Sequence, residues 1–258
     1  MSTLSAIYGI VARDLTRMTR QTSRLLGGVA RPFMWLLLVG TGYNAIARLQ
    51  GDLSYQEFVY PGIIVMAALF GAMLTAISTV YDREFGMLRL MLASPVGTPA
   101  VLAGRALAAA VVGFLQGGIV LAVAPLVLPL DLRTMAAAAG ALLIAAGSSS
   151  MLGLLVAVRL RSVENFAGVI NVVLFPLLFA SGALYPTRGM PQPLRWLAQA
   201  NPVTYQVDAM RHALGQPTEF PAGLDVAVLV LVTLVVFGLA TLLFDTEQRF
   251  VGRKAAKD

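Results

Sequence analysis

The sequence predicts an all-α integral membrane protein with six transmembrane helices, organised as a single transmembrane domain over residues 1–258. Two observations predict this class: 58% of the 258 residues are hydrophobic, and only 12% are charged. A soluble domain usually carries about a quarter charged residues. The deficit indicates that most of the chain meets lipid or other apolar helices.

Six apolar runs are each long enough to cross the hydrocarbon layer, which takes roughly 20 helical residues. Inside lipid each segment must satisfy its own backbone hydrogen bonds, so the runs are predicted to be helices. The alternating pattern of a membrane β-barrel does not occur. The predicted spans are residues 25–46, 59–80, 100–128, 135–158, 166–184 and 226–244.

Composition excludes several kinds of chemistry. The chain has no cysteine and a single histidine, His212, which excludes a disulfide framework, a thiol nucleophile and a Cys-rich or His-rich metal site. A phosphate-binding loop needs a Gly-Lys pair, and neither lysine, Lys254 or Lys257, follows a glycine. The net charge of +6 could suit nucleic acid, but the arginines border the apolar runs. We therefore expect a non-enzyme with no catalytic residue, metal, cofactor or nucleic acid of its own.

The distribution of Lys and Arg predicts that both termini lie in the cytoplasm, including a cytoplasmic tail over residues 245–258. Positive residues favour the cytoplasmic side of a membrane, and an even number of spans places both termini on one side. With this orientation the outer connections hold few of the 19 Lys and Arg residues, namely Arg48, Arg133, Arg188, Arg195 and Arg211.

Residues 1–24 are predicted to form an amphipathic helix that lies in the cytoplasmic interface. Arginines recur every three or four residues on one face, and apolar residues such as Leu4 and Tyr8 occupy the opposite face. Such a helix places its arginines among lipid headgroups. The alternative is an amphipathic helix packed on another protein surface. The arginines of this face are Arg13, Arg17, Arg20 and Arg24.

A short apolar segment, residues 82–97, separates the second and third spans on the predicted cytoplasmic side; we call it the plug. Residues 85–93 are apolar nearly all round a helix, so in water they need a protein groove. Pro95 disfavours helix at Ser94, and Gly97 starts a tight turn into the third span. Pushing on such a plug would tilt both neighbouring spans. The alternative is a simple interfacial anchor.

Residues 185–215 are predicted to form short outer helices that are partly re-entrant. Asn201 and Pro202 read as an N-cap followed by proline at the first helical position, and Gly215 is placed to end that helix. Trp196 and Tyr205 suit the membrane interface. The alternative is a structured outer cap with no role in transport.

The predicted spans carry no ionisable residue near their middle. Arg31 and Arg105, close to the cytoplasmic ends, are expected to extend to the headgroups. Ion-coupled carriers commonly need a buried ionisable group, so any transport energy is expected to come from outside the chain.

Small residues repeat every fourth position at Ala109, Gly113 and Gly117, which predicts close helix packing.

Polar and aromatic residues within the spans are candidates for a substrate path, and the polar ones equally for helix–helix hydrogen bonds. They are Gln116, Ser149, Asn171, Phe175 and Phe179.

The order of these parts resembles the permease subunits of type-2 ABC transporters, above all the bacterial drug, lipo-oligosaccharide and general export permeases. The likeness rests on the stretches EFGMLRLMLASPVG and NPVTYQVDAMRHAL, together with the amphipathic N-terminus and the six spans. In that family the plug would be a coupling helix seated in a cleft of a separate ATPase. The candidate coupling residues are Glu84, Phe85, Met87, Leu88, Arg89, Ser94 and Pro95. The re-entrant outer helices would close the outer end of the path, with Tyr185, Pro186, Asn201, Pro202 and Tyr205 as candidate gate residues.

The resemblance implies an exporter of a hydrophobic or amphiphilic small molecule, lipid or glycoconjugate in the bacterial cytoplasmic (inner) membrane. Its partners would be two copies of an ABC ATPase that binds ATP and Mg, a second permease copy or paralogue, and membrane lipids. Two other functions compete: an ion-coupled secondary transporter, and a non-transporting membrane scaffold or sensor that docks a cytoplasmic partner.

Overall fold

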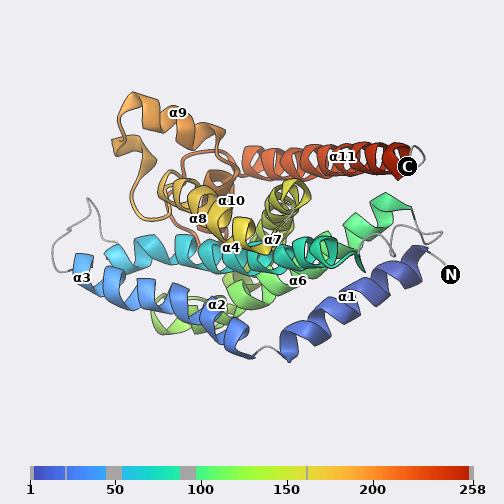
Figure 1. The fold of residues 1–258 in the computed structure, drawn as a ribbon. Helices are drawn as coiled ribbons and strands as arrows, with labels where there is room; N and C mark the ends of the chain where they lie inside the picture. The colour runs from blue at the N-terminus through green and yellow to red at the C-terminus, as the bar shows by residue number, and fades with distance from the viewer. Residues whose placement is uncertain (1–2, 21, 45–53, 88–96, 161, 256–258) are drawn as a thin grey trace.

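The computed structural model describes residues 3–20, 22–44, 54–87, 97–160 and 162–255. Within these ranges the chain forms helices, turns and short connections but no strand, which confirms the predicted all-α class. The long helices pack into one bundle around α4 (Figure 1). In chain order, the helices of the described residues, long and short, are α1 (Thr3–Thr19), α2 (Thr22–Met34), the π-helix η1 (Trp35–Gly40), α3 (Thr41–Asn44), α4 (Tyr55–Glu84), α6 (Thr98–Val123), the 3-10 helix η2 (Ala124–Leu126), α7 (Leu132–Arg159), α8 (Val163–Phe179), the 3-10 helix η3 (Thr187–Gly189), α9 (Gln192–Ala200), α10 (Pro202–Ala213) and α11 (Ala222–Ala255).

Four of the helices that the structure describes are long and apolar enough to cross a membrane. They are α4, α6 continued by η2, α7 and the Ala222–Phe244 part of α11, and they coincide with the predicted spans 59–80, 100–128, 135–158 and 226–244. The predicted span 166–184 corresponds to α8, which has 17 residues and ends at Phe179. The predicted span 25–46 corresponds to α2, η1 and α3, which follow one another without a break. Membrane crossing by these last two segments stays a prediction.

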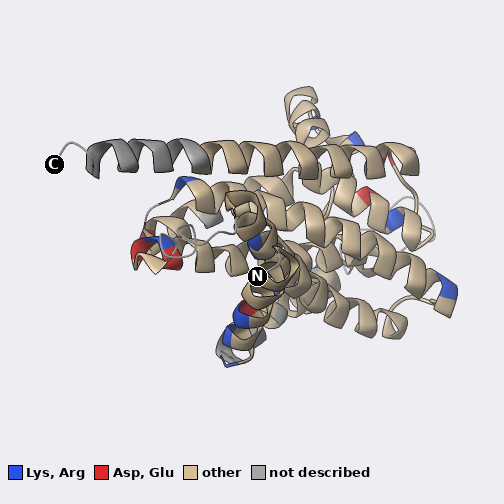
Figure 2. Ribbon diagram, turned by 90° about the vertical axis from the view of Figure 1, so that its right-hand side faces the viewer, with Lys and Arg blue, Asp and Glu red and all other residues tan. Residues whose placement is uncertain are grey.

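The bundle has two ends, which we name after α4. The Glu84 end also holds the start of α6 and the last turn of α7, whereas the Tyr55 end holds the end of α6 and the start of α7. Lys, Arg, Asp and Glu lie mostly toward the ends of the long helices, whose middles are uncharged (Figure 2). This pattern suits a bundle whose middle lies in hydrocarbon.

The N-terminal segment differs from its prediction, because residues 1–24 do not form one helix. α1 ends at Thr19 and α2 begins at Thr22, so the predicted arginine face is divided and Arg24 lies on α2. The apolar residues Leu4 and Tyr8 of α1 are exposed, as a helix lying in the interface requires.

Close approach of α4 and α6 builds the centre of the bundle. A Cβ at Gly113 would lie 2.6 Å from the carbonyl oxygen of Ala68, and one at Gly117 would lie 3.2 Å from the carbonyl oxygen of Ile64. The hydroxyl of Tyr60 donates to the carbonyl of Val120 at 3.0 Å across the same contact. The small-residue repeat in the third predicted span therefore marks a helix–helix contact.

The segment 185–215 contains η3, α9 and α10. The Oδ1 atom of Asn201 accepts from the backbone N–H of Val203 at 3.0 Å, and Pro202 is the first residue of α10. Gly215, with φ of +70°, follows the end of that helix. The N-cap and the glycine stop are therefore confirmed, whereas re-entry into the membrane stays a prediction.

Gly113→Ala is expected to lower the unfolding temperature of the purified chain, because the new Cβ meets backbone of α4. Overpacking of this kind costs about 1–3 kcal/mol. Gly118→Ala is the matched control, since a Cβ there meets nothing within 4 Å and both variants gain the same helix propensity. Thermal unfolding in detergent, followed by circular dichroism, measures both. Equal midpoints for the two variants would contradict the close α4–α6 contact.

Candidate functional site

A buried network of charges joins three helices at the Glu84 end; we call it the arginine–aspartate cluster, formed by Arg13, Asp14, Ser78, Asp82 and Arg105. Nη1 of Arg105 donates to Oδ2 of Asp14 and to Oγ of Ser78, each at 3.1 Å, and its Nη2 donates to Asp82. Nη2 of Arg13 donates to Oδ2 of Asp82 at 2.7 Å. The cluster thus fixes α1 and α6 to the last turns of α4.

The cluster corrects the expectation that Arg105 extends to the headgroups. Its side chain is 1% exposed, because Asp14 and Asp82 offer it two carboxylates inside the protein. Arg13 also turns toward α4 instead of lipid. A buried ion pair is tolerated only where hydrogen bonds compensate for lost hydration, and this cluster supplies them with two charges of each sign.

The other residues at the end of α4 contact further helices. Nη1 of Arg83 donates to the carbonyls of Val158 and Leu160, at 2.6 and 3.1 Å, beside the end of α7. Oε2 of Glu84 accepts from the backbone N–H of Val163 at 3.1 Å, at the start of α8. The Arg83 guanidinium also lies 5.1 Å from the ring centre of Phe244 on α11. The last turn of α4 is therefore held by α7, α8 and α11 as well.

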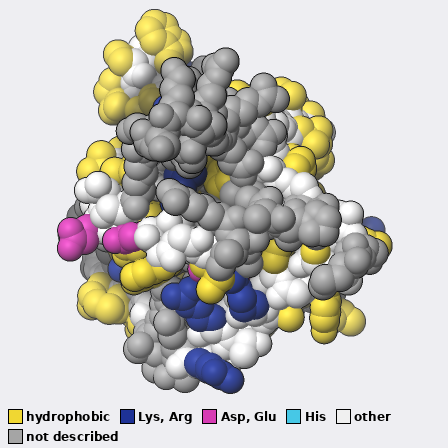
Figure 3. All heavy atoms as spheres, turned by 45° about the vertical axis from the view of Figure 1, so that its right-hand side comes forward, with side chains coloured by type: hydrophobic (Ala, Val, Ile, Leu, Met, Phe, Trp, Pro, Cys, Tyr) yellow, Lys and Arg dark blue, Asp and Glu magenta, His cyan; other side chains and the backbone are white. Residues whose placement is uncertain are grey.

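Two of the candidate coupling residues present an exposed apolar surface beside this anchored turn. Phe85 is 76% exposed and Met87 is 47% exposed. The ring of Phe85 stacks on that of Tyr81 at 6.1 Å, and Arg17 of α1 lies 5.2 Å from the Tyr81 ring centre. Basic and hydrophobic side chains share the face that Figure 3 brings forward. The candidates Leu88, Arg89, Ser94 and Pro95 lie outside the residues that the structure describes.

A cavity of about 270 Å³ opens between α2 with η1, α4 and α8. Its lining is largely aromatic and aliphatic, with Arg31 and Asn171 as the polar members among the described residues: Arg31, Trp35, Gly62, Ile63, Met66, Phe70, Asn171, Phe175, Leu178, Phe179, Ala183 and Leu184. The Arg31 guanidinium lies 4.5 Å from the ring centre of Phe70. An apolar pocket with few polar groups is the usual form of a site for amphiphilic molecules.

The candidate path residues divide into two groups. Asn171, Phe175 and Phe179 line the cavity, as the sequence places them on one predicted span. Gln116 and Ser149 are buried away from it.

Gln116 and Ser149 lie where helices meet. The Gln116 amide fills space that glycines leave open: a Cβ at Gly28 or Gly71 would lie within 2.7 Å of it. Oγ of Ser149 donates to Oε1 of Gln206 at 3.1 Å, joining α7 to α10.

Three of the candidate gate residues, Asn201, Pro202 and Tyr205, lie at the start of α10. Nδ2 of Asn201 donates to the carbonyl of Leu177 at 2.7 Å, which fixes α10 to α8. The hydroxyl of Tyr205 donates to the carbonyl of Gln199 at 2.7 Å. Tyr185 and Pro186 are exposed.

Sequence reasoning missed Asp14 and Asp82 as site residues. The available signal was Arg105 itself, since an arginine within an apolar run needs a carboxylate partner when it is not at the headgroups. Asp14 and Asp82 are among the carboxylates on the same predicted side of the membrane, but residue spacing alone does not indicate which of them pair with Arg105 on another helix.

Residues 5–214 match the model of the family described as ABC-2 type transporter. The chain is 28% identical over 219 residues to the transport permease ycf38 of Cyanophora paradoxa, covering 81% of this chain and 73% of that protein. It is 26% identical over 230 residues to the inner membrane transport permease YadH of Escherichia coli strain K12, covering 87% and 89%. It is 30% identical over 187 residues to the multidrug ABC transporter permease YbhR of that strain, covering 71% and 49%.

Arg105→Met is expected to destabilise the chain by about 3–5 kcal/mol, because it leaves Asp14 and Asp82 buried with too little positive charge. Arg159→Met, at the exposed end of α7, is the matched control. Unfolding midpoints of the detergent-purified variants test this. If the two variants unfold alike, the cluster does not hold α1, α4 and α6 together.

Proposed function

Because this chain belongs to the ABC-2 type transporter family and is a permease subunit of it, we propose that it exports a hydrophobic or amphiphilic molecule with energy from a separate ATPase. The cargo class includes lipids and glycoconjugates. The observation that carries the proposal is the exposed apolar pair Phe85 and Met87, placed directly after a helix end that five other helices hold.

The proposed coupling runs through the plug. An apolar surface of this kind gains free energy when a partner groove covers it. ATP binding would bring two ATPase subunits together and move the plug seated in each. Since the arginine–aspartate cluster is costly to break, the end of α4 would carry α1 and α6 with it as one unit. The ATP and Mg belong to the partner subunit.

The proposed path passes the cavity between α2 and α8. Trp35 and Phe179 meet edge to face at 6.1 Å across it, and Phe175 lies 6.0 Å from Phe179. Leu38 and Val172, on the same two segments, add exposed apolar surface. A second copy or a paralogue would cover it, so that the path lies between two permease subunits.

The proposed orientation places the Glu84 end and both termini in the cytoplasm of a bacterial cell, with the chain in its cytoplasmic (inner) membrane. The Lys and Arg distribution supports it. Under this orientation the segment 185–215 lies outside and closes the path, with Asn201 fixing α10 to α8.

Replacing Phe85 and Met87 together by alanine is expected to weaken binding of the ATPase subunit by about tenfold or more, because two apolar anchors at an interface are lost. Transport in proteoliposomes that contain both subunits should fall with it. The paired replacement of Leu126 and Leu132, exposed at the Tyr55 end, is the matched control. Thermal unfolding confirms that both variants are folded.

Three outcomes contradict the proposal. Full transport by the Phe85/Met87 variant would exclude coupling through this surface. Cargo movement by the chain without ATPase and ATP would indicate an ion-coupled carrier. Stable ATPase binding without cargo-dependent ATP turnover would indicate a scaffold or sensor.

A further inference from the structure

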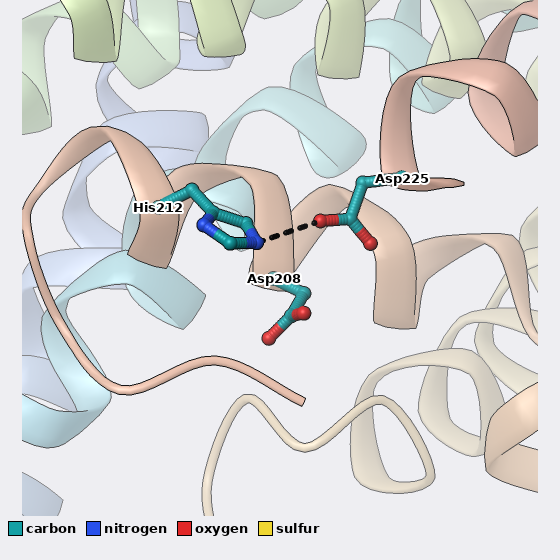
Figure 4. A group of neighbouring side chains, drawn as sticks. All are labelled: Asp208, His212 and Asp225. Atoms are coloured by element: carbon teal, nitrogen blue, oxygen red, sulfur yellow. Dashed lines mark ion pairs between the residues drawn. The ribbon is translucent and has the colours of Figure 1, made fainter. Parts of the chain in front are cut away.

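Three potential metal-binding side chains converge at the Tyr55 end, where α10 meets α11. Asp208 and His212 lie one helical turn apart on α10, and Asp225 lies in the first turn of α11 (Figure 4). One donor atom from each lies within 4.8 Å of the other two. His212 Nε2 lies 3.4 Å from Asp225 Oδ2.

Asp225 is the unusual member of this group. Its side chain is fully buried, yet neither carboxylate oxygen has a hydrogen-bond partner among the described residues. An ionised carboxylate buried in this way is costly unless a cation compensates for the lost hydration. Both oxygens are therefore available to a cation that the side chains of α10 would share.

We propose that Asp208, His212 and Asp225 bind a divalent transition-metal ion, with Zn²⁺ as the ion that best fits the donors. Tetrahedral zinc with imidazole and carboxylate ligands at about 2.0–2.2 Å separates two neighbouring donor atoms by about 3.4 Å. His212 Nε2 and Asp225 Oδ2 have that separation. One imidazole and two carboxylates leave a fourth position for water.

Asp208 is held in place for this role by the turn before α11. Its Oδ1 and Oδ2 accept from the backbone N–H of Glu219 at 3.0 and 3.1 Å, and Oδ2 also accepts from that of Phe220 at 2.8 Å. A carboxylate has about four lone-pair sites, so these bonds leave capacity for a metal. Hydrogen bonds of this kind orient metal-binding carboxylates.

His212 changes partner when the ion binds. In the structure Nε2 lies 2.8 Å from the carbonyl oxygen of Phe220, so in the metal-free chain it donates its proton there. Zinc replaces that proton, because only a neutral imidazole nitrogen binds metal. The side chain is 29% exposed, which gives an ion access from solvent. Nitrogen among the donors favours zinc over Mg²⁺ or Ca²⁺, which prefer oxygen alone.

Zinc binding to the full-length chain in detergent tests the proposal, using an affinity tag without histidine because His212 is the only histidine of the sequence. Competition with a chromophoric chelator should show one tight site per chain, and Zn²⁺ should raise the unfolding temperature. His212→Gln keeps a donor for the Phe220 carbonyl but is a poor zinc ligand, and Asp225→Asn keeps the shape of its side chain. Each should weaken zinc binding at least tenfold.

Asp131→Asn is the matched control, because an asparagine at the N-cap would still cap α7 and the position lies away from the proposed zinc ligands. It should bind zinc like the unmodified chain. The proposal is overturned if the unmodified chain shows no tight site, or if His212→Gln and Asp225→Asn bind zinc as well as Asp131→Asn. A fall in the unfolding temperature of Asp225→Asn, together with no effect of zinc on the unfolding temperature of the unmodified chain, would also overturn it, since the residues would then form an ion pair alone.

Discussion

The burial of Arg105 constrains the whole Glu84 end of this permease. A guanidinium removed from water loses several kcal/mol of hydration, and the carboxylates placed at the nitrogens of Arg105 compensate for that loss. Asp14 comes from α1 and Asp82 from α4, so the position of one side chain on α6 fixes two other helices. Separating any of the three would leave an unpaired charge inside the protein, and moving them together leaves every pair intact.

The neighbouring contacts extend this constraint along the end of α4. Arg83 reaches two carbonyls beside the end of α7, and Glu84 accepts from the first residue of α8. At the opposite end different bonds hold the helices: the hydroxyl of Tyr55 donates to the carbonyl of Leu184 at 2.8 Å, and Nη2 of Arg211 donates to that of Gly182 at 2.8 Å. Between the ends, glycines let α4 and α6 touch. Contacts between helices therefore hold the bundle at both ends and in its middle.

Hydropathy and residue spacing predicted the parts of the fold that depend on one segment at a time. They located four membrane-length helices, the Asn201 cap and the Gly215 stop, because each depends on local residues. They placed the end of the fifth predicted helix at residue 184, whereas α8 ends at Phe179. The turn after α8 contains apolar residues such as Ala180 and Ala183, and hydropathy does not distinguish such a turn from a helix. They also missed the break between α1 and α2.

The site was harder to predict because it depends on pairs of distant residues. Asp14 and Arg105 are 91 positions apart, and nothing in the spacing of either helix indicates the other. The sequence did identify Asn171, Phe175 and Phe179 as candidates within one predicted span, and these three line the cavity together. Gln116 and Ser149 have the same polar character, but Gln116 packs against glycines of neighbouring helices and Ser149 donates to Gln206.

Labelling of a single cysteine tests the central claim most directly, since the natural chain contains none. In Met87→Cys, the new thiol would lie at the exposed end of α4. A membrane-impermeant maleimide should label it only from the cytoplasmic side, and bound ATPase subunit should protect it. Labelling from the outer side, or labelling from the inside that the ATPase does not reduce, would contradict coupling through this end of the bundle.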